Sequence, residues 1–378
     1  MVKLQYGQKI DPGLLLDHVS KSRSCLTMNQ NHKSGESYAA LYSMRPLKKL
    51  MSCLRPKQKE EISVEFLKNG GELLEEPIAS FGGRHRIPIV SFSAEELIRA
   101  TNDFAQCVHI SENGYLFKGC LGERPVLLKM FHDEIISPRK LNGAIIDIVI
   151  TSQISHLKNV LKLIGCCLEF KYPAMVYEDA GIELLTDLLY NPNNDKFFHW
   201  KSRLKVAADI AYVIAYLHAA FPRPVIYNRE LRADKVIINR FGVTKLFDFS
   251  NSVMLPPGEF QVKDFFWIGD FRNIDPEYAK SKAINQKTDV YSIGLLLLNL
   301  LAGQHSLWPH PVDEIVRINK STGFFHKDQL KHYVDQKITE EGGNEAEMQL
   351  QNFLDIAHRC IQYTGEDRPD MMTVAKRA

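Results

Sequence analysis

The spacing of apolar positions along the chain changes near residue 180. Between residues 105 and 180, short apolar runs of strand length are separated by turn residues, with one helical segment over residues 139–155. From residue 183 onward the apolar positions follow a helical period, as they do over residues 200–221. Strands followed by helices predict an α+β fold with a strand-rich lobe over residues 105–180 and a helical lobe over residues 181–378.

A helical lead-in is predicted ahead of the strands, over residues 56–104. In the segment FSAEELIRATNDF (92–104), Ser93 is a suitable N-cap, and Glu96 completes a capping box three residues later. Farther upstream, the pair Gly70–Gly71 predicts a break between a short helix and a second turn within residues 60–76.

Residues 1–55 show no sustained apolar period and are predicted to form a poorly ordered, basic extension. From Arg45 to Lys59 there are six basic residues and no acidic one. A solvated tail is the favoured interpretation. The alternative is peripheral contact with an anionic membrane surface, helped by acylation of Cys53. Met51 is a second candidate start of the protein.

Composition and charge narrow the class of protein. A net charge of +2 over 378 residues argues against a nucleic-acid partner, which would favour a strong basic excess. The seven cysteines are odd in number and lack metal-ligand spacing, so a reducing, cytoplasmic location is favoured. The longest apolar run, residues 293–302, is well short of the roughly 20 residues that span a bilayer, which predicts a buried helix.

Eight short motifs follow the order and spacing of protein-kinase landmarks. A kinase needs a strand lysine paired with a helix glutamate, an HRD…N catalytic loop and a DFG metal segment. The motifs here are FKG (117–119), VLLK (126–129), KLIGCCLE (162–169), MVYED (175–179), KLFDFS (245–250), DPEY (275–278), DVYSIG (289–294) and EDRPDM (366–371). Each is weak alone, but together they resemble a bilobal protein-kinase fold over residues 92–378.

The residues expected to hold ATP are only partly kept. Lys129 takes the position of the phosphate-binding lysine. Its helix partner aligns to Asp147, so the ion pair must lengthen or the helix must move inward; a solvated Asp147 is the alternative. Leu127 replaces the usual alanine and is predicted to fill part of the adenine slot. Because this site looks idle, Lys129→Ala is expected to change stability little.

The glycine-rich phosphate loop is degraded. Its three glycine positions fall on His109, Ser111 and Gly114, and side chains at two of them would hinder the close approach of backbone to phosphate. An ordinary hairpin is the favoured interpretation of this segment.

The catalytic loop carries the largest changes. The base position holds Glu230, the usual lysine is Arg232, and the metal-binding asparagine is Lys235, which puts a cation where Mg²⁺ should bind. Asp248 keeps the metal-binding aspartate of DFG, with Ser250 in place of the glycine. Together these residues predict a pseudokinase with no intact catalytic residue and no required cofactor, and they leave weak ATP and Mg²⁺ binding open.

Structural positions of the kinase fold are better kept than chemical ones. Glu277 and Arg368 match the buried ion pair of the helical lobe, and Asp289 matches the aspartate that holds the catalytic-loop backbone. A buried pair is costly to break, because the surviving charge is left without a partner.

With these residues in place, the chain resembles the ZED-related plant pseudokinases of the receptor-like cytoplasmic kinase and wall-associated-kinase-like lineage. The segments MSCLRPKQKEE, GELLEE and FSAEEL are similar too. The resemblance implies an adaptor in plant innate immunity that links a coiled-coil nucleotide-binding leucine-rich-repeat receptor to receptor-like cytoplasmic kinases. Two alternatives remain: an atypical active Ser/Thr kinase, and a nucleotide-binding switch without phosphotransfer.

The segment between Asp248 and Glu277 predicts a docking surface. It carries five aromatic residues within twelve positions, which is more than a short loop usually buries: Phe260, Phe265, Phe266, Trp267 and Phe271. The docking residues are expected to be Phe265, Phe266 and Trp267. We expect these three side chains to contact a partner kinase or receptor.

Overall fold

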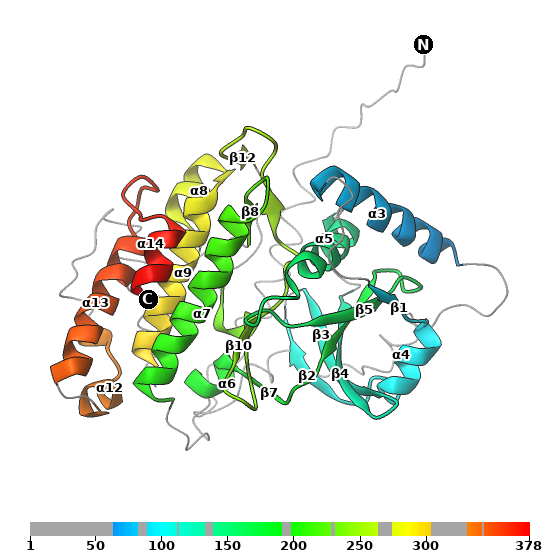
Figure 1. Ribbon diagram of the computed structural model, residues 1–378, viewed down its shortest axis with the longest axis horizontal. Helices are drawn as coiled ribbons and strands as arrows, with labels where there is room; N and C mark the ends of the chain where they lie inside the picture. Colours follow the sequence, from blue (N-terminus) through cyan, green and yellow to red (C-terminus); the bar gives the residue numbers. More distant parts are fainter. Residues whose placement is uncertain are drawn as a thin grey trace, which may run out of the picture. The chain divides into compact units, whose positions relative to one another are not determined.

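A computed structural model describes residues 63–81, 89–111, 113–132, 139–190, 198–227, 231–263, 274–303, 331–341 and 344–378. It confirms the α+β fold with a strand-rich lobe and a helical lobe (Figure 1). The segments 1–55, Glu230 and the aromatic residues Phe265, Phe266 and Trp267 lie outside the described residues.

One six-stranded sheet forms the first lobe, in the order β1-β5-β6-β4-β3-β2. All neighbouring strands run antiparallel except β1 and β5. The bounds are β1 Val90–Ser91, β2 Cys107–Ile110, β3 Gly114–Leu121, β4 Arg124–Phe131, β5 Leu163–Cys167 and β6 Ala174–Glu178. The strands β3 to β6 match the apolar runs of the sequence, whereas β1 lies in the segment predicted as a helical lead-in.

Alternation along the strands sends neighbouring side chains to opposite faces of this sheet. Leu127 packs in the cluster that includes Ala144 and Ile148 of α5 (Arg139–Ile154). Its neighbour Leu128 packs with α4 (Ala94–Ala100) instead. One helix therefore covers each face, and α5 lies on the face that meets the helical lobe.

The capping box predicted for α4 is confirmed. The Ser93 hydroxyl accepts from the Glu96 N–H at 3.2 Å, and the Glu96 carboxylate accepts from the Ser93 N–H at 2.8 Å. The helix ends at Ala100, before the predicted residue 104, because Asn102, Asp103 and Phe104 adopt positive φ angles.

The predicted break at Gly70–Gly71 is wrong, since helix α3 (Val64–Phe81) runs through both glycines. Asn69 anchors the helix to the lobe: its amide donates to the carbonyls of Leu168 and Phe170, each at 2.9 Å. Two buried hydrogen bonds and apolar packing outweigh the helix cost of about 1 kcal/mol for each glycine.

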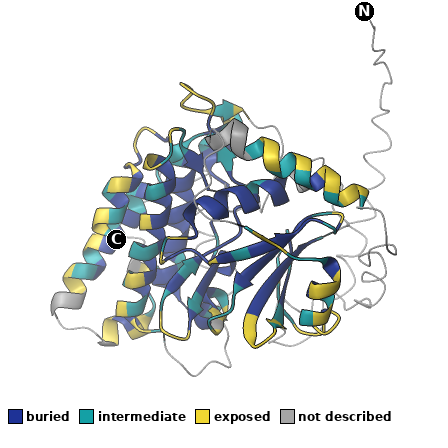
Figure 2. Cartoon of the chain, turned by 45° about the vertical axis from the view of Figure 1, so that its right-hand side comes forward, coloured by how far each residue is buried: buried dark blue, intermediate teal, exposed yellow. Residues whose placement is uncertain are grey.

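The helical lobe is built around α9 (Gln286–Ala302), which is buried along nearly its whole length (Figure 2). This confirms that residues 293–302 belong to a buried helix. The other helices are α6 Leu185–Tyr190, α7 Trp200–Ala219, α8 Pro276–Ser281, α12 Gln336–Glu341, α13 Asn344–Cys360 and α14 Met371–Arg377, with the 3₁₀ turns η2 Ala233–Lys235 and η3 Lys331–Tyr333. No helix in the described ranges is long and apolar enough to cross a membrane.

The helical lobe also contains short strands. They are β7 Ile182–Leu184, β8 Val225–Ile226, β9 Val236–Asn239, β10 Thr244–Leu246, β11 Val253–Met254, β12 Val262–Lys263 and β13 Ala283–Ile284. The Leu161 N–H donates to the carbonyl of Leu246 at 2.9 Å, which fixes the end of β10 against the first lobe. Asp248 follows two residues later and therefore enters the space between the lobes.

Candidate functional site

Lys129 lies at the centre of the site, on β4. Its ammonium donates to Asp147 Oδ2 on α5 and to Asp248 Oδ1 from the helical lobe, both at 2.6 Å. All three side chains are buried, so the solvated form of Asp147 is excluded. Because Lys129 holds two buried carboxylates, we now expect Lys129→Ala to destabilise the protein, in place of the small change expected from the sequence.

The shorter Asp147 side chain is matched by a close approach of α5 to the segment after Asp248. A Cβ added to Gly143 of α5 would lie 3.0 Å from the carbonyl oxygen of Ser250. Asp147 Oδ1 also accepts from the Phe249 N–H at 3.0 Å and from the Thr151 hydroxyl at 3.1 Å. The glycine thus allows the inward position of the helix that an aspartate requires.

Asp248 is ionised and tightly enclosed. Burial alone would raise its pKa, but the ammonium groups of Lys129 and Lys235 outweigh burial and hold the pKa of Asp248 well below its usual value. Burial opposes the charge on Lys129 too, yet Asp147 and Asp248 together raise the pKa of Lys129. The Ser250 hydroxyl donates to Asp248 Oδ1 at 2.5 Å, so serine at the DFG glycine position occupies one side of the carboxylate.

The metal position does not fit Mg²⁺. Asp248 Oδ2 accepts from the Asn113 amide at 3.0 Å, and the Lys235 ammonium lies 3.8 Å from the same oxygen. Mg²⁺ prefers an octahedral set of oxygen ligands, often several of them waters. Here the surroundings of Asp248 are two ammonium groups, an amide N–H and a hydroxyl. No group of three or more His, Cys, Asp or Glu side chains that could hold a metal occurs among the described residues.

Apolar side chains of both lobes meet where the resemblance places adenine. Leu127 is fully buried, in one cluster with Leu184, Ile237 and Phe247 of the helical lobe. Phe247 is 4 % exposed, and its ring meets the His109 ring edge-on at 6.4 Å between centroids. Sequence reasoning missed Phe247, although a bulky residue directly before Asp248 was the available signal.

The degraded phosphate loop is a hairpin. The Ser111 N–H donates to the carbonyl of Gly114 at 2.9 Å, and the Gly114 N–H donates back to the Ser111 hydroxyl at 3.2 Å. A Cβ on Gly114 would lie 2.0 Å from the carbonyl oxygen of Met130, so strand pairing explains this glycine. Burial lowers the pKa of His109 and favours its neutral form.

Of the three altered catalytic-loop positions, two are described. Arg232 pairs with Asp234 two residues later, with Nε 3.1 Å from Oδ1. Asp234 is buried; burial alone would raise its pKa, but Arg232 outweighs this effect and the pKa is lowered. Arg232 is therefore committed to a neighbouring carboxylate, while Lys235 faces Asp248.

Asp289 lies where the resemblance places it. Its Oδ2 atom accepts from the backbone N–H of Tyr227, directly ahead of the catalytic loop, and contacts His218 Nε2, both at 2.8 Å.

The predicted ion pair between Glu277 and Arg368 is wrong. Arg368 makes a bidentate pair with Asp275, at 2.7 and 2.8 Å, and its other N–H groups donate to backbone carbonyls of Gln362, Tyr363 and Lys287. Asp275 is buried at the N-cap of α8, whereas Glu277 is half-buried and accepts from the Gly365 N–H. The DPEY motif was correctly placed, but its first residue, Asp275, is the acid that pairs with Arg368.

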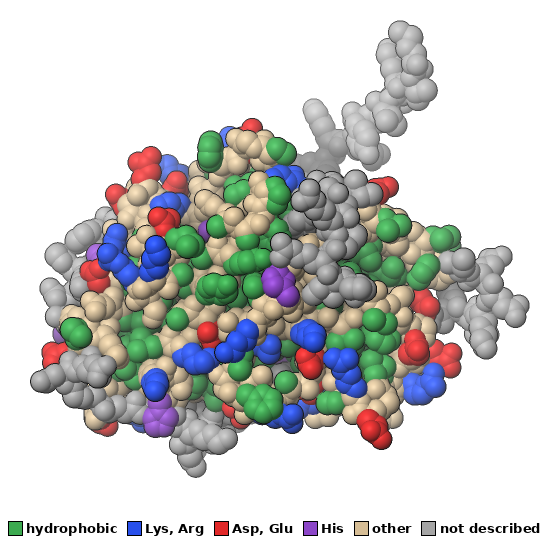
Figure 3. Space-filling model, in the orientation of Figure 1, with side chains coloured by type: hydrophobic (Ala, Val, Ile, Leu, Met, Phe, Trp, Pro, Cys, Tyr) green, Lys and Arg blue, Asp and Glu red, His purple; other side chains and the backbone are tan. Residues whose placement is uncertain are grey.

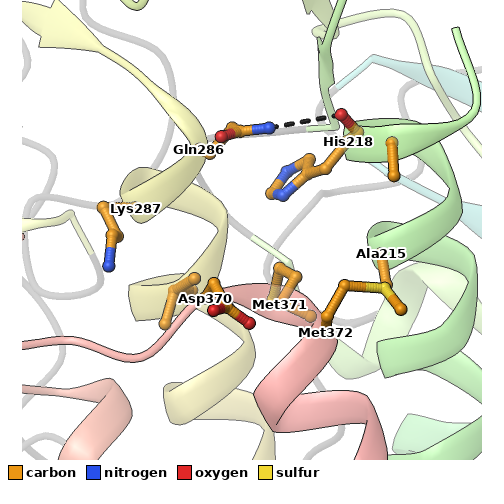
Figure 4. Close-up of a pocket in the computed structure, with 9 residues that line it drawn as sticks. Ala215, His218, Gln286, Lys287, Asp370, Met371 and Met372 are labelled. Carbon is orange, nitrogen blue, oxygen red and sulfur yellow. Dashed lines mark hydrogen bonds between the residues drawn. The ribbon is translucent and has the colours of Figure 1, made fainter.

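A separate cavity of about 130 Å³ lies in the helical lobe, between α7, α9 and α14 (Figure 4). Gln286 donates across its rim to the carbonyl of His218 at 3.3 Å. The side chain of His218 already contacts Asp289, and no residue of the interlobe site lines the cavity. We therefore place the functional site between the lobes.

These features define a protein kinase with altered metal and base positions. Residues 113–378 match the family model of the protein kinase domain. Three relatives from Arabidopsis thaliana are the non-functional pseudokinase ZED1 (35 % identical, 82 % of this chain and 94 % of ZED1), the non-functional pseudokinase ZRK2 (31 %, 85 % and 91 %) and the serine/threonine-protein kinase ZRK1 (31 %, 85 % and 93 %). The chain belongs to this ZED1-related family of plant pseudokinases and kinases.

Proposed function

We propose that this chain is a non-catalytic adaptor that uses a kinase fold to bind other proteins. The observation that carries the proposal is the state of Asp248: the metal-binding carboxylate of a kinase is bound here by Lys129, Asn113 and Ser250 and faces the Lys235 ammonium. Leu127 and Phe247 fill the neighbouring apolar space. Phosphoryl transfer needs Mg²⁺ and nucleotide at these positions, so a different use of the fold is favoured.

The partners we propose are a coiled-coil nucleotide-binding leucine-rich-repeat immune receptor and receptor-like cytoplasmic kinases. Similarity to ZED1 and ZRK2, both named non-functional pseudokinases, supports the non-catalytic part of this role. The immune role follows from the family resemblance of the sequence. Phe260 in the loop after Asp248 is 88 % exposed, which favours docking through this loop.

No cofactor is required in this function, and weak ATP binding remains an outcome to be tested. We propose a cytoplasmic location, with the basic residues 45–59 available for peripheral contact with the plasma membrane. Lys and Arg side chains on the face shown in Figure 3 lie among acidic ones. Pairs such as Arg124–Glu178 and Lys205–Asp209 support the expectation that nucleic acid is not a partner.

An active Ser/Thr kinase is the second candidate. The formed Lys129–Asp147 pair favours it, and so does the name of the relative ZRK1. Transfer of labelled γ-phosphate, measured with purified full-length protein on itself and on a generic substrate, separates the two candidates. We expect no incorporation; incorporation that is lost in an Asp248→Asn variant would establish the kinase. Nucleotide binding without incorporation would favour the switch.

Co-precipitation tests the adaptor directly. The triple variant Phe265→Ala, Phe266→Ala, Trp267→Ala should lose recovery of a receptor-like cytoplasmic kinase or the receptor. The matched control is Phe241→Ala, since Phe241 is 70 % exposed in the turn between β9 and β10. Circular dichroism checks folding. Undiminished recovery by a folded triple variant would exclude this loop as the docking surface.

A further inference from the structure

Lys235 is buried without hydrogen bonds that explain its position. It ends η2, is 1 % exposed, and its ammonium makes no hydrogen bond within the described part of the chain. Its ion-pair partner there is Asp248 Oδ2, at 3.8 Å. Taking an ammonium out of water is costly, so a buried lysine with unmatched donors needs an explanation.

Asp248 is one of the residues that join the two lobes. It belongs to the helical lobe, but its two oxygens accept from Lys129 on β4 and from Asn113 ahead of β3. In a kinase, the same carboxylate reaches the phosphates of the nucleotide through Mg²⁺. Here the positive charge beside Oδ2 comes from Lys235, a residue of the chain itself.

The cluster already holds two cations. Burial raises the pKa of Asp147, and the Lys129 ammonium opposes this rise. Two ammonium groups, on Lys129 and Lys235, face two carboxylates, on Asp147 and Asp248. All four side chains are at most 4 % exposed. A divalent cation beside Asp248 would add two positive charges next to two ammonium groups in a site with little water to screen them.

We propose that Lys235 is the resident cation of this site: its ammonium takes the place of the divalent metal, and the lobes are joined through Asp248 without metal or nucleotide. The metal site is then latent in the fold. Removing the ammonium leaves Asp248 Oδ2 with the Asn113 amide as its remaining neighbour, so that an oxygen-seeking divalent cation can approach this oxygen. The asparagine that kinases carry at the position of Lys235 supplies a second oxygen.

Lys235→Asn tests the proposal with metal alone. The melting temperature of the full-length protein is measured with and without millimolar Mg²⁺ or Mn²⁺, in the absence of nucleotide and partner. The wild type should not respond. Lys235→Asn should gain a rise of about 3 °C or more at saturating metal, since a ligand that binds only the folded state stabilises it. Adding Asp248→Asn to this variant should abolish the gain.

Two further measurements complete the test. The first is the metal response of a second amide variant, Lys235→Gln, and the second is Mn²⁺ binding to the wild type, followed by electron paramagnetic resonance. Asp248-dependent Mn²⁺ binding by the wild type overturns the proposal, and so does a folded Lys235→Asn or Lys235→Gln protein without a metal response. If neither amide variant folds, absence of Mn²⁺ binding by the wild type supports a cation that the fold requires. None of these results depends on whether the chain binds the proposed partners.

Discussion

Two buried ion clusters in this protein differ in how completely their donors are matched. In the helical lobe, all five N–H groups of Arg368 have partners, two of them on Asp275. Between the lobes, Lys129 is matched by two carboxylates, but Lys235 beside it makes no hydrogen bond with the described residues.

The difference separates a cluster that holds the fold from a cluster whose original ligand has been replaced. In a fully matched guanidinium network, the hydrogen bonds offset the cost of removing the charges from water and fix a single packing of the lobe. In the second cluster, the Lys235 ammonium takes the place of a metal ion whose preferred geometry differs from its own, and its hydrogen-bond donors are therefore unmatched. Substitution of either member of the Arg368–Asp275 pair should therefore lower the free energy of unfolding. In the interlobe cluster, the loss should differ from one residue to the next.

The largest effect is expected at the centre of the interlobe cluster. Lys129→Met leaves Asp147 and Asp248 buried with a single cation, the Lys235 ammonium 3.8 Å from Asp248 Oδ2, so the free energy of unfolding should fall by about 4–5 kcal/mol. Chemical denaturation measures it. Lys205→Met is the control, because Lys205 pairs with Asp209 at the same distance of 2.6 Å but on the surface. Comparable small losses would show that the buried pairs are not formed.

A somewhat smaller effect is expected in the helical lobe. Asp275→Asn removes the charge that faces Arg368 and should lower the free energy of unfolding by about 3 kcal/mol. Glu277→Gln should cost about 1 kcal/mol or less, because among the described residues Glu277 accepts from the Gly365 backbone N–H and forms no ion pair. Thermal denaturation of both variants measures which substitution lowers the stability more. A reversed order would restore Glu277 as the partner of Arg368.

The hairpin contact with Asp248 should contribute less. Asn113→Ala removes a half-buried amide that donates to a carboxylate, so a loss of about 1–2 kcal/mol is expected. Asn251→Ala is the matched control, since the Asn251 amide nitrogen makes no hydrogen bond within the described ranges. Equal unfolding curves for the two variants would mean that Asn113 does not link the hairpin to the helical lobe.

The smallest effect is a change in pH dependence at His109. Because burial lowers the pKa of His109, the unfolded state takes up its proton at a higher pH than the folded state. This residue therefore removes stability as pH falls below about 6.5, the ordinary histidine pKa. In His109→Gln, the drop in unfolding free energy between pH 7.5 and pH 5.5 should be shallower than in the wild type. Parallel pH profiles would contradict the buried, neutral state of His109.

The strands and helices of the fold were predictable because each is indicated by a local pattern of residues. The short apolar run that contains VLLK predicted β4, and Ser93 with Glu96 predicted the start of α4. The apolar run of residues 293–302 predicted a buried helix. Such signals involve residues within a few positions of each other, so the sequence alone carries them. The altered chemistry at Leu127 and Lys235 was visible for a similar reason, because motif spacing assigns each position a role.

Contacts between distant segments were decided by the tertiary structure. Motif position assigned the partner of Arg368 to Glu277, but whether Asp275 or Glu277 meets Arg368 depends on how α8 is oriented against a loop about 90 residues away. The helix through Gly70–Gly71 is held by Asn69, which donates to carbonyls about 100 residues away in the chain. Asn113, Lys129, Lys235 and Asp248 converge only when the lobes pack together. The sequence determined which charges the site contains; long-range packing decided which of them are matched.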